Sequence, residues 1–224
     1  MFAIFDAKDK RRKRPNKSNQ SYFENELIYF DVNYLIIMTN ITIMTDTNRQ
    51  YDEVMASCKK IFLSKAKDYG TAWRVLRTIS IVDQIFIKAQ RIRTVQEIGH
   101  QKVEDDIAAD MKGIINYAVI GLIQLDLPAD APEEMELDKI NILYDADAAK
   151  AKKTMQDKNH DYGEAWRDMS QESFVDLILM KLQRIKQILA NEGKTIMSEG
   201  IDANYIDIIN YAVFALVLMA EVKS

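Results

Sequence analysis

The heptapeptide Asp-Tyr-Gly-Glu-Ala-Trp-Arg at residues 161–167 organises this chain, because it occurs almost unchanged at residues 68–74 as Asp-Tyr-Gly-Thr-Ala-Trp-Arg, 93 residues earlier. The similarity continues beyond the heptapeptide. With one residue gained, the run Ile-Ile-Asn-Tyr-Ala-Val at 114–119 reappears at 208–213. Self-similarity of this length predicts a tandem duplication of a unit of roughly 75 residues, and two copies predict a pseudo-twofold pair.

The first helix of each unit is predicted to end at the repeated glycine. From Tyr51 to Lys67 apolar side chains recur at steps of three and four, which is typical of an amphipathic helix. Gly70 then favours the left-handed conformation that follows many helices, and Gly163 occupies the same place in the second unit.

A second and a third helix follow in each unit. Ser80 with Asp83, and Ser173 with Asp176, resemble capping boxes that begin the second helix. The third helix is predicted at about residues 103–125 and 201–222, and it is apolar nearly all round, as a buried helix is. The fold is predicted to be all-α, a tandem duplication of a three-helix unit packed as one pseudo-twofold helical bundle.

These patterns divide the chain into four parts. Residues 51–125 form the first repeat (copy one) and residues 137–222 the second (copy two), with residues 126–136 as a linker that holds two prolines. Residues 1–43 belong to neither copy. We interpret them as a poorly ordered extension, with Met44 as an alternative start of translation.

Composition excludes several classes of function. A net charge of −4 and a pI near 5.4 argue against a nucleic acid as the main partner and leave room for a small anionic ligand. The single cysteine, Cys58, fits a reducing cytoplasm and the role of a small buried hydrophobe. Carboxylates interrupt the apolar N-terminal run, so no membrane anchor is expected there. Large apolar helices make a homodimer plausible.

Two cations are kept in the second helix of both copies. Lys88 and Arg91 are i,i+3 neighbours, as are their equivalents Lys181 and Arg184. Charged residues on a helix usually form a solvated face. Because both cations recur in both copies, a phosphate clamp is the alternative, and all four residues are candidate ligands of an anion.

The heptapeptide itself offers a carboxylate and an aromatic ring. Asp68 and Asp161 fall in the last turn of the first helix, where a carboxylate opposes the helix macrodipole at a cost of roughly 0.3–1 kcal/mol. Their recurrence indicates either a metal ion or a specific cation, such as the arginine of the heptapeptide. Trp73 and Trp166 are either core anchors or platforms on which a base stacks.

The third helix carries a polar group inside an apolar run. Asn116 and Asn210 are flanked by Ile, Ala, Val and Tyr, where an unsatisfied amide would cost about 1–3 kcal/mol. Asp110 in copy one and Asp207 in copy two share the stripe at different depths. Each asparagine either fixes helix register or, with the carboxylate, contributes to an Mg²⁺ site.

The order of these motifs resembles one known family. Asp-Tyr-Gly, then Lys-x-x-Arg, then the Asp-x-x-Asn-Tyr-Ala of residues 207–212 is similar to the nucleotide modification associated domain family, the first of that name. The resemblance covers residues 51–222. It implies a role in nucleotide or modified-base metabolism and carries over no established activity.

A weaker similarity connects the chain to the all-α NTP pyrophosphatases of the MazG type. It implies Mg²⁺-dependent hydrolysis of an ordinary or modified nucleoside triphosphate to monophosphate and pyrophosphate. Asn210 would orient a ligand or water, Trp166 would contact the substrate, and the metal ligands would be Asp68, Asp161, Glu164 and Asp207. Copy one has Thr71 and Gly113 where copy two has Glu164 and Asp207, which favours copy two as the site.

Two hypotheses of different class therefore stand at this point. One is a magnesium-dependent enzyme of nucleotide metabolism. The other is a non-catalytic helical module that binds a nucleotide or a protein, in which the polar residues form a structural network.

Overall fold

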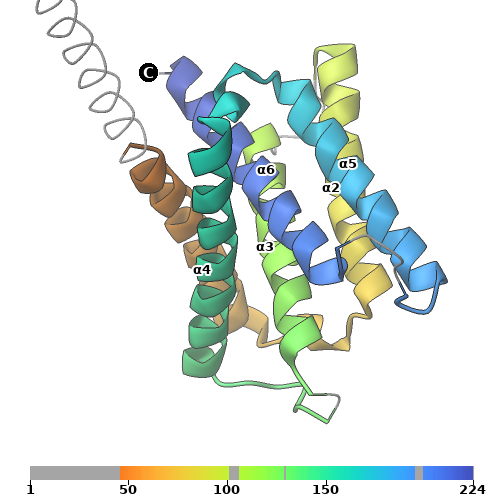
Figure 1. Ribbon diagram of the computed structural model, residues 1–224. Coiled ribbons are helices and arrows are strands. Elements are labelled where there is room, and N and C mark those ends of the chain that lie inside the picture. Colours follow the sequence, from red (N-terminus) through yellow and green to blue (C-terminus); the bar gives the residue numbers. More distant parts are fainter. Residues whose placement is uncertain (1–45, 101–105, 129, 195–198, 224) are drawn as a thin grey trace, which may run out of the picture. The chain divides into compact units, whose positions relative to one another are not determined.

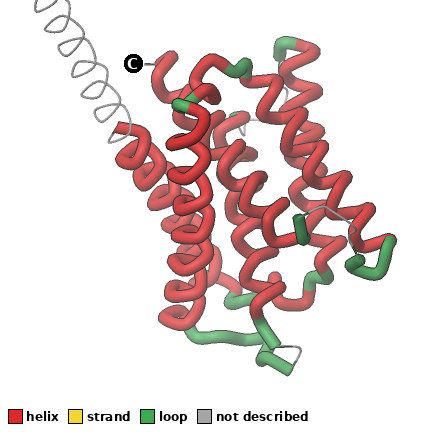
Figure 2. Tube along the Cα trace, in the orientation of Figure 1, coloured by secondary structure: helices red, strands yellow, loops and turns green. Residues whose placement is uncertain are grey.

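The computed structural model describes residues 46–100, 106–128, 130–194 and 199–223, and within these ranges the regular structure is helical, with no strand (Figures 1 and 2). The chain divides into two units, Met1–Asp46 and Thr47–Ser224, and the second unit is the subject below. The predicted extension over residues 1–43 lies outside the described residues.

The same elements recur in the same order in both copies. Copy one has a helix over residues 46–69, the short 3₁₀ helix η1 and two long helices, and copy two repeats this set. This order confirms the predicted all-α tandem repeat. The remaining elements are η1 (Ala72–Val75), α2 (Thr78–Ile98), α3 (Ile107–Asp126), α4 (Leu137–Tyr162), η2 (Ala165–Asp168), α5 (Gln171–Ala190) and α6 (Ile201–Lys223).

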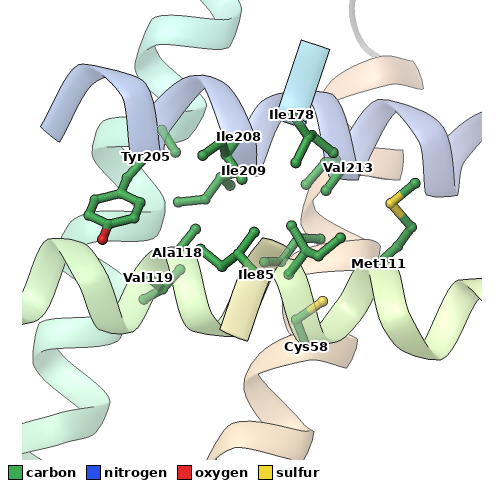
Figure 3. Close-up of a cluster of buried hydrophobic side chains, with 14 of the residues drawn as sticks. Cys58, Ile85, Met111, Ala118, Val119, Ile178, Tyr205, Ile208, Ile209 and Val213 are labelled. Carbon is green, nitrogen blue, oxygen red and sulfur yellow. The ribbon is translucent and has the colours of Figure 1, made fainter. Parts of the chain in front are cut away.

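The third helices, α3 and α6, form the centre of the bundle. They pack against each other, α2 packs on α3, α5 packs on α6, and α2 contacts α5. Figure 3 shows Ile85, Ala118, Ile178 and Ile209 meeting there, and all four are fully buried. Burying an isoleucine side chain contributes about 1.5–3 kcal/mol, so this seam holds the copies together.

Helix α6 is apolar enough to be compared with a membrane span. Over Ile201–Val222 its mean hydropathy is 1.7, and 61% of its most apolar window is buried within the protein. Its apolar character follows from its position, because it packs against α3, α5 and α4. This matches the prediction that the third helix of each unit is the buried one.

Pairs of contacts between the copies are reciprocal. Lys59 Nζ lies 2.6 Å from Asp145 Oδ1, and the equivalent pair with roles exchanged, Lys152 and Asp52, is joined at 2.7 Å. Since the earlier residue of one helix pairs with the later residue of the other, the helix over residues 46–69 and α4 are antiparallel. Crossed pairs of this kind are what a pseudo-twofold axis between the copies requires.

The predicted helix ends are correct at the glycines. Gly70 and Gly163 have φ of 64° and 60°, and their amides donate to the carbonyls of Ala66 and Asn159. The left-handed conformation is open to glycine at little cost, so these positions end the first helix of each copy.

The predicted capping boxes are wrong. Helix α2 begins at Thr78, and α5 begins at Gln171 after Ser170, whose hydroxyl accepts from the amide of Ser173. Ser80 and Ser173 therefore lie inside the first turn. In each copy two extended residues, Leu76 and Arg77 or Met169 and Ser170, connect the preceding 3₁₀ helix to the next helix.

Asp83 and Asp176, the acidic members of those boxes, reach the other copy instead. Asp83 Oδ1 lies 2.8 Å from Lys186 Nζ, and Asp176 Oδ1 lies 3.8 Å from Arg93. These two contacts are again equivalent with roles exchanged. They join α2 to α5 on the surface.

Candidate functional site

A pocket of about 670 Å³ lies in copy one, between its three helices. The first helix contributes the wall from Ile61 to Gly70, and η1 contributes Trp73. Ligand pockets of proteins typically enclose about 300–1,000 Å³, so the space suits a small molecule. Its polar lining comes mainly from lysines, aspartates, tyrosines and an asparagine: Lys65, Lys88, Lys112, Asp106, Asp110, Tyr69, Tyr117 and Asn116.

The apolar part of the pocket is aromatic. Phe62 and Trp73 have ring centroids 6.3 Å apart, and Tyr69 lines the pocket with 57% of its surface exposed. Walls of apolar and aromatic side chains with a small number of polar groups are typical of small-molecule pockets.

Asp110 organises the charges of copy one. It is 7% exposed on α3 and pairs with two cations of α2, namely Arg91 and, at 3.4 Å, Lys88. The structure therefore brings the two predicted cations of copy one, Lys88 and Arg91, to the same carboxylate. This anion is a side chain of the protein itself.

In copy two the carboxylate of the third helix lies one turn later, at Asp207, the equivalent of Gly113. Asp207 is 4% exposed, and its two oxygens each receive a lysine at 2.5 Å, Oδ1 from Lys158 on α4 and Oδ2 from Lys181 on α5. Burial lowers the pKa of Lys158, but the hydrogen bond and charge of Asp207 outweigh it, so this pKa is raised overall. Arg184 lies half-buried on the same helix as Lys181.

Each arginine of the heptapeptides donates hydrogen bonds to the segment at the start of the other copy. Arg74 donates to the carbonyls of Ala131 and Pro132 in the linker before α4. Arg167 donates to Thr47 and Gln50 in the first turns of the helix over residues 46–69. Neither is therefore the predicted partner of Asp68 or Asp161, and their recurrence has a structural reason.

The residue that follows the glycine of the heptapeptide differs between the copies. Thr71 donates to the carbonyl of Glu133 at 2.6 Å and accepts from the amide of Met135, so it also holds the linker. Its equivalent, Glu164, is 6% exposed, accepts from Arg167 at 2.8 Å and has a φ of 59°. A non-glycine residue in this left-handed region is uncommon and strained.

Trp166 is packed in the core of copy two. It is 7% exposed, stacks on Phe214 with ring centroids 4.2 Å apart, and carries the guanidinium of Arg167 at 4.4 Å from its centroid. This favours the core-anchor interpretation over a stacking platform. Trp73, in contrast, is part-buried and lines the copy-one pocket.

Asn116 and Asn210 form crossed bridges between the copies. Asn210 accepts from the hydroxyl of Tyr51 at 2.8 Å and donates to the carbonyl of Ala151. Asn116 accepts from Tyr144 at 2.9 Å and donates to the carbonyl of Cys58. Each amide thus binds the first helix of its own copy and the tyrosine of the other, which favours the helix-register interpretation.

The predicted metal ligands do not lie together. Asp68 is exposed, Asp161 is 73% exposed beside His160, and Glu164 and Asp207 are bound by the cations described above. In the described part of the chain no three His, Cys, Asp or Glu side chains gather as a metal site would need. The Mg²⁺ site of copy two stays a prediction.

The main residues that sequence reasoning missed are Lys65 and Lys112. Lys65 lies in the pocket wall, and its equivalent in copy two is Lys158, which binds Asp207. The retention of this lysine at the 93-residue spacing was a visible signal. It was of the same kind as the one that singled out Lys88 and Lys181.

A comparison with protein families identifies the chain. The model of nucleotide modification associated domain 1 matches residues 65–125 and 158–219, one segment in each copy. The chain belongs to this family. Its name connects the protein with nucleotide modification, and the double match supports the tandem duplication.

The other comparisons add no relative. No curated protein matches the sequence, and no solved structure does. The similarity to the MazG-type pyrophosphatases stays a prediction.

Proposed function

We propose that copy one of this nucleotide modification associated domain protein is a binding site for a nucleotide, ordinary or modified. The observation that carries the proposal is the 670 Å³ pocket with an aromatic wall and three lysines, Lys65, Lys88 and Lys112. Lysine is a common phosphate ligand, and the aromatic rings supply a surface for a base. The family name supports a nucleotide over other small anions.

The proposal differs from the sequence-based preference for copy two. There the carboxylate that would hold a metal ion is bound by two lysines of the chain, and the tryptophan is covered. In copy one the lysine equivalents line a pocket. We therefore regard copy two as the structural half and copy one as the ligand-binding half.

Calorimetric titration with a panel of nucleoside mono- and triphosphates tests this function. Lys65→Gln removes a cation from the pocket wall, and Lys60→Gln is its control, because Lys60 is an exposed lysine of the same helix that does not line the pocket. We expect the best nucleotide to lose about tenfold in affinity with Lys65→Gln and to bind Lys60→Gln as it binds the wild type. Equal affinity for all three proteins would contradict a site in this pocket.

Hydrolysis is a second candidate, which one observation favours. Asp106 lines the same pocket as the lysines, and Mg²⁺ in proteins takes one or two carboxylates and fills its remaining positions with water and phosphate. A bound Mg²⁺ would polarise the phosphate oxygens. A ³¹P NMR time course with Mg²⁺ and nucleoside triphosphates would detect pyrophosphate and monophosphate. If neither product forms from any triphosphate of the panel, hydrolysis is contradicted and binding is the function that remains.

A further inference from the structure

Copy two shows how two lysines of this helical framework hold an anion. The carboxylate of Asp207 is held between Lys158 of α4 and Lys181 of α5 at 2.5 Å each. The carboxylate and Lys181 are buried, whereas the side chain of Lys158 is 49% exposed. What occupies the same place in copy one is therefore informative.

The repeat spacing identifies the equivalents in copy one. Lys65 and Lys88 correspond to the two lysines of copy two at a spacing of 93 residues, and Gly113 corresponds to Asp207 at a spacing of 94. All three residues line the copy-one pocket. Copy one thus has both cations but has glycine where copy two has the anion.

Lys88 is placed to exchange partners. Its Nζ lies 3.4 Å from Asp110, whereas a strong charge-assisted hydrogen bond is about 2.7–2.9 Å long. Its stem covers Gly113, since a Cβ there would lie 2.8 Å from Lys88 Cε, the far end of a flexible chain. Arg91 also pairs with Asp110, so that carboxylate keeps a counter-charge when Lys88 turns towards a ligand.

We infer that the phosphate of the bound nucleotide occupies, above Gly113 and between Lys65 and Lys88, the position that the Asp207 carboxylate takes in copy two. This inference rests on the proposed nucleotide-binding function and specifies its subsite. With Asp110 balanced by Arg91, the described residues of the pocket lining include Lys65, Lys88 and Lys112 against Asp106. That excess of positive charge fits a phosphomonoester, which carries about −1.5 to −2 at pH 7, and so a nucleoside monophosphate.

Substitution at Gly113 tests the subsite. Gly113→Asp supplies the anion that copy two carries, and Gly113→Asn adds a side chain of the same size without the charge. The probes are the four 5′-deoxynucleoside monophosphates and the corresponding nucleosides, titrated by calorimetry. Circular dichroism melts of each variant check folding, and copy two shows that this framework accommodates an aspartate at the equivalent position.

We expect Gly113→Asp to weaken monophosphate binding at least tenfold and Gly113→Asn to weaken it less. Lys65→Gln should weaken the monophosphate and leave the nucleoside unchanged. Unaltered monophosphate affinity in Gly113→Asp, or equal losses of monophosphate and nucleoside in Lys65→Gln, would overturn the subsite while leaving nucleotide binding intact. Binding of triphosphates without monophosphates would do the same, whereas no binding of any nucleotide by the wild type would overturn the proposed function as well.

Discussion

The two copies share a framework and differ at the polar centre of each third helix. In copy two Asp207 lies buried between two lysines and ties three helices together. In copy one the equivalent residue is Gly113, a carboxylate lies one turn earlier at Asp110, and both line a pocket. On the proposed function, one half stabilises the fold by pairing its own cations, while the other half offers cations to a ligand.

The largest expected difference between the copies is the cost of losing the carboxylate. Asp207→Asn leaves two lysines without a counter-charge, and Lys181 is only 6% exposed, so we expect a loss of about 3–5 kcal/mol in the free energy of unfolding. Asp110→Asn should cost less, about 1.5–3 kcal/mol, because the side chains of Lys88 and Arg91 are 29% and 25% exposed. Urea denaturation measures both, and equal costs would contradict the contrast.

Loss of the asparagine should also cost more free energy of unfolding in copy two than in copy one. Asn210→Ala removes the partner of the buried hydroxyl of Tyr51 and should cost about 1–3 kcal/mol. Asn116→Ala should cost less, because its two bonds are only part-buried. A double-mutant cycle of Asn210→Ala with Tyr51→Phe should give a coupling energy well above zero, and strictly additive losses would show that the two side chains do not act as a pair.

Because Tyr51 and Tyr144 are buried, we expect the free energy of unfolding to depend on pH in the alkaline range. Burial is the main cause that raises the pKa of Tyr51 and of Tyr144 well above the ordinary 10.0. Above about pH 10 the unfolded chain loses the phenolic protons that the folded chain keeps, so stability falls as pH rises. Each tyrosine contributes up to about 1.4 kcal/mol per pH unit, and none of this loss is present at neutral pH.

Phenylalanine at either position should flatten that alkaline slope by the same amount. Urea denaturation between pH 9 and 11 measures it for Tyr51→Phe and Tyr144→Phe. Slopes that match the wild type would contradict buried neutral tyrosines, and flattening by only one variant would break the equivalence of the crossed bridges.

The smallest effects are expected on the surface between α2 and α5. Lys186 and Asp83 are joined at 2.8 Å with 32% and 51% of their side chains exposed, and Arg93 and Asp176 are 3.8 Å apart. Exposed pairs contribute about 0.2–1 kcal/mol and weaken with salt. Asp83→Asn should therefore destabilise slightly in low salt, with Asp176→Asn below it, and a difference that persists in 1 M salt would argue against an electrostatic origin.

Much of the fold could be predicted because it depends on local patterns. The spacing of apolar residues indicated the helices, and the glycines at 70 and 163 marked where the first helix of each copy ends. The starts of α2 and α5 were predicted wrongly because a short 3₁₀ helix precedes each of them. A 3₁₀ helix of four residues has no apolar periodicity by which the sequence could indicate it. Helix starts set by such local geometry are difficult to read from a capping pattern.

The candidate site could be predicted only in part. Retention in both copies singled out Lys88, Lys181 and the asparagines, but the pairing of Tyr51 with Asn210 depends on how the copies pack. Sequence reasoning favoured copy two because it has more carboxylates. That Lys158 from another helix already binds Asp207 required the three-dimensional contact.

The central claim is that a nucleotide binds copy one and not copy two, and the two tryptophans report on the copies separately. Wild-type protein labelled with 5-fluorotryptophan should give two ¹⁹F resonances, assigned with Trp73→Phe, because the chain holds one tryptophan in each copy. During titration with the best-binding nucleotide we predict that the resonance of Trp73, in the pocket wall, shifts and that of Trp166, stacked on Phe214, does not. A shift confined to Trp166 would contradict the account.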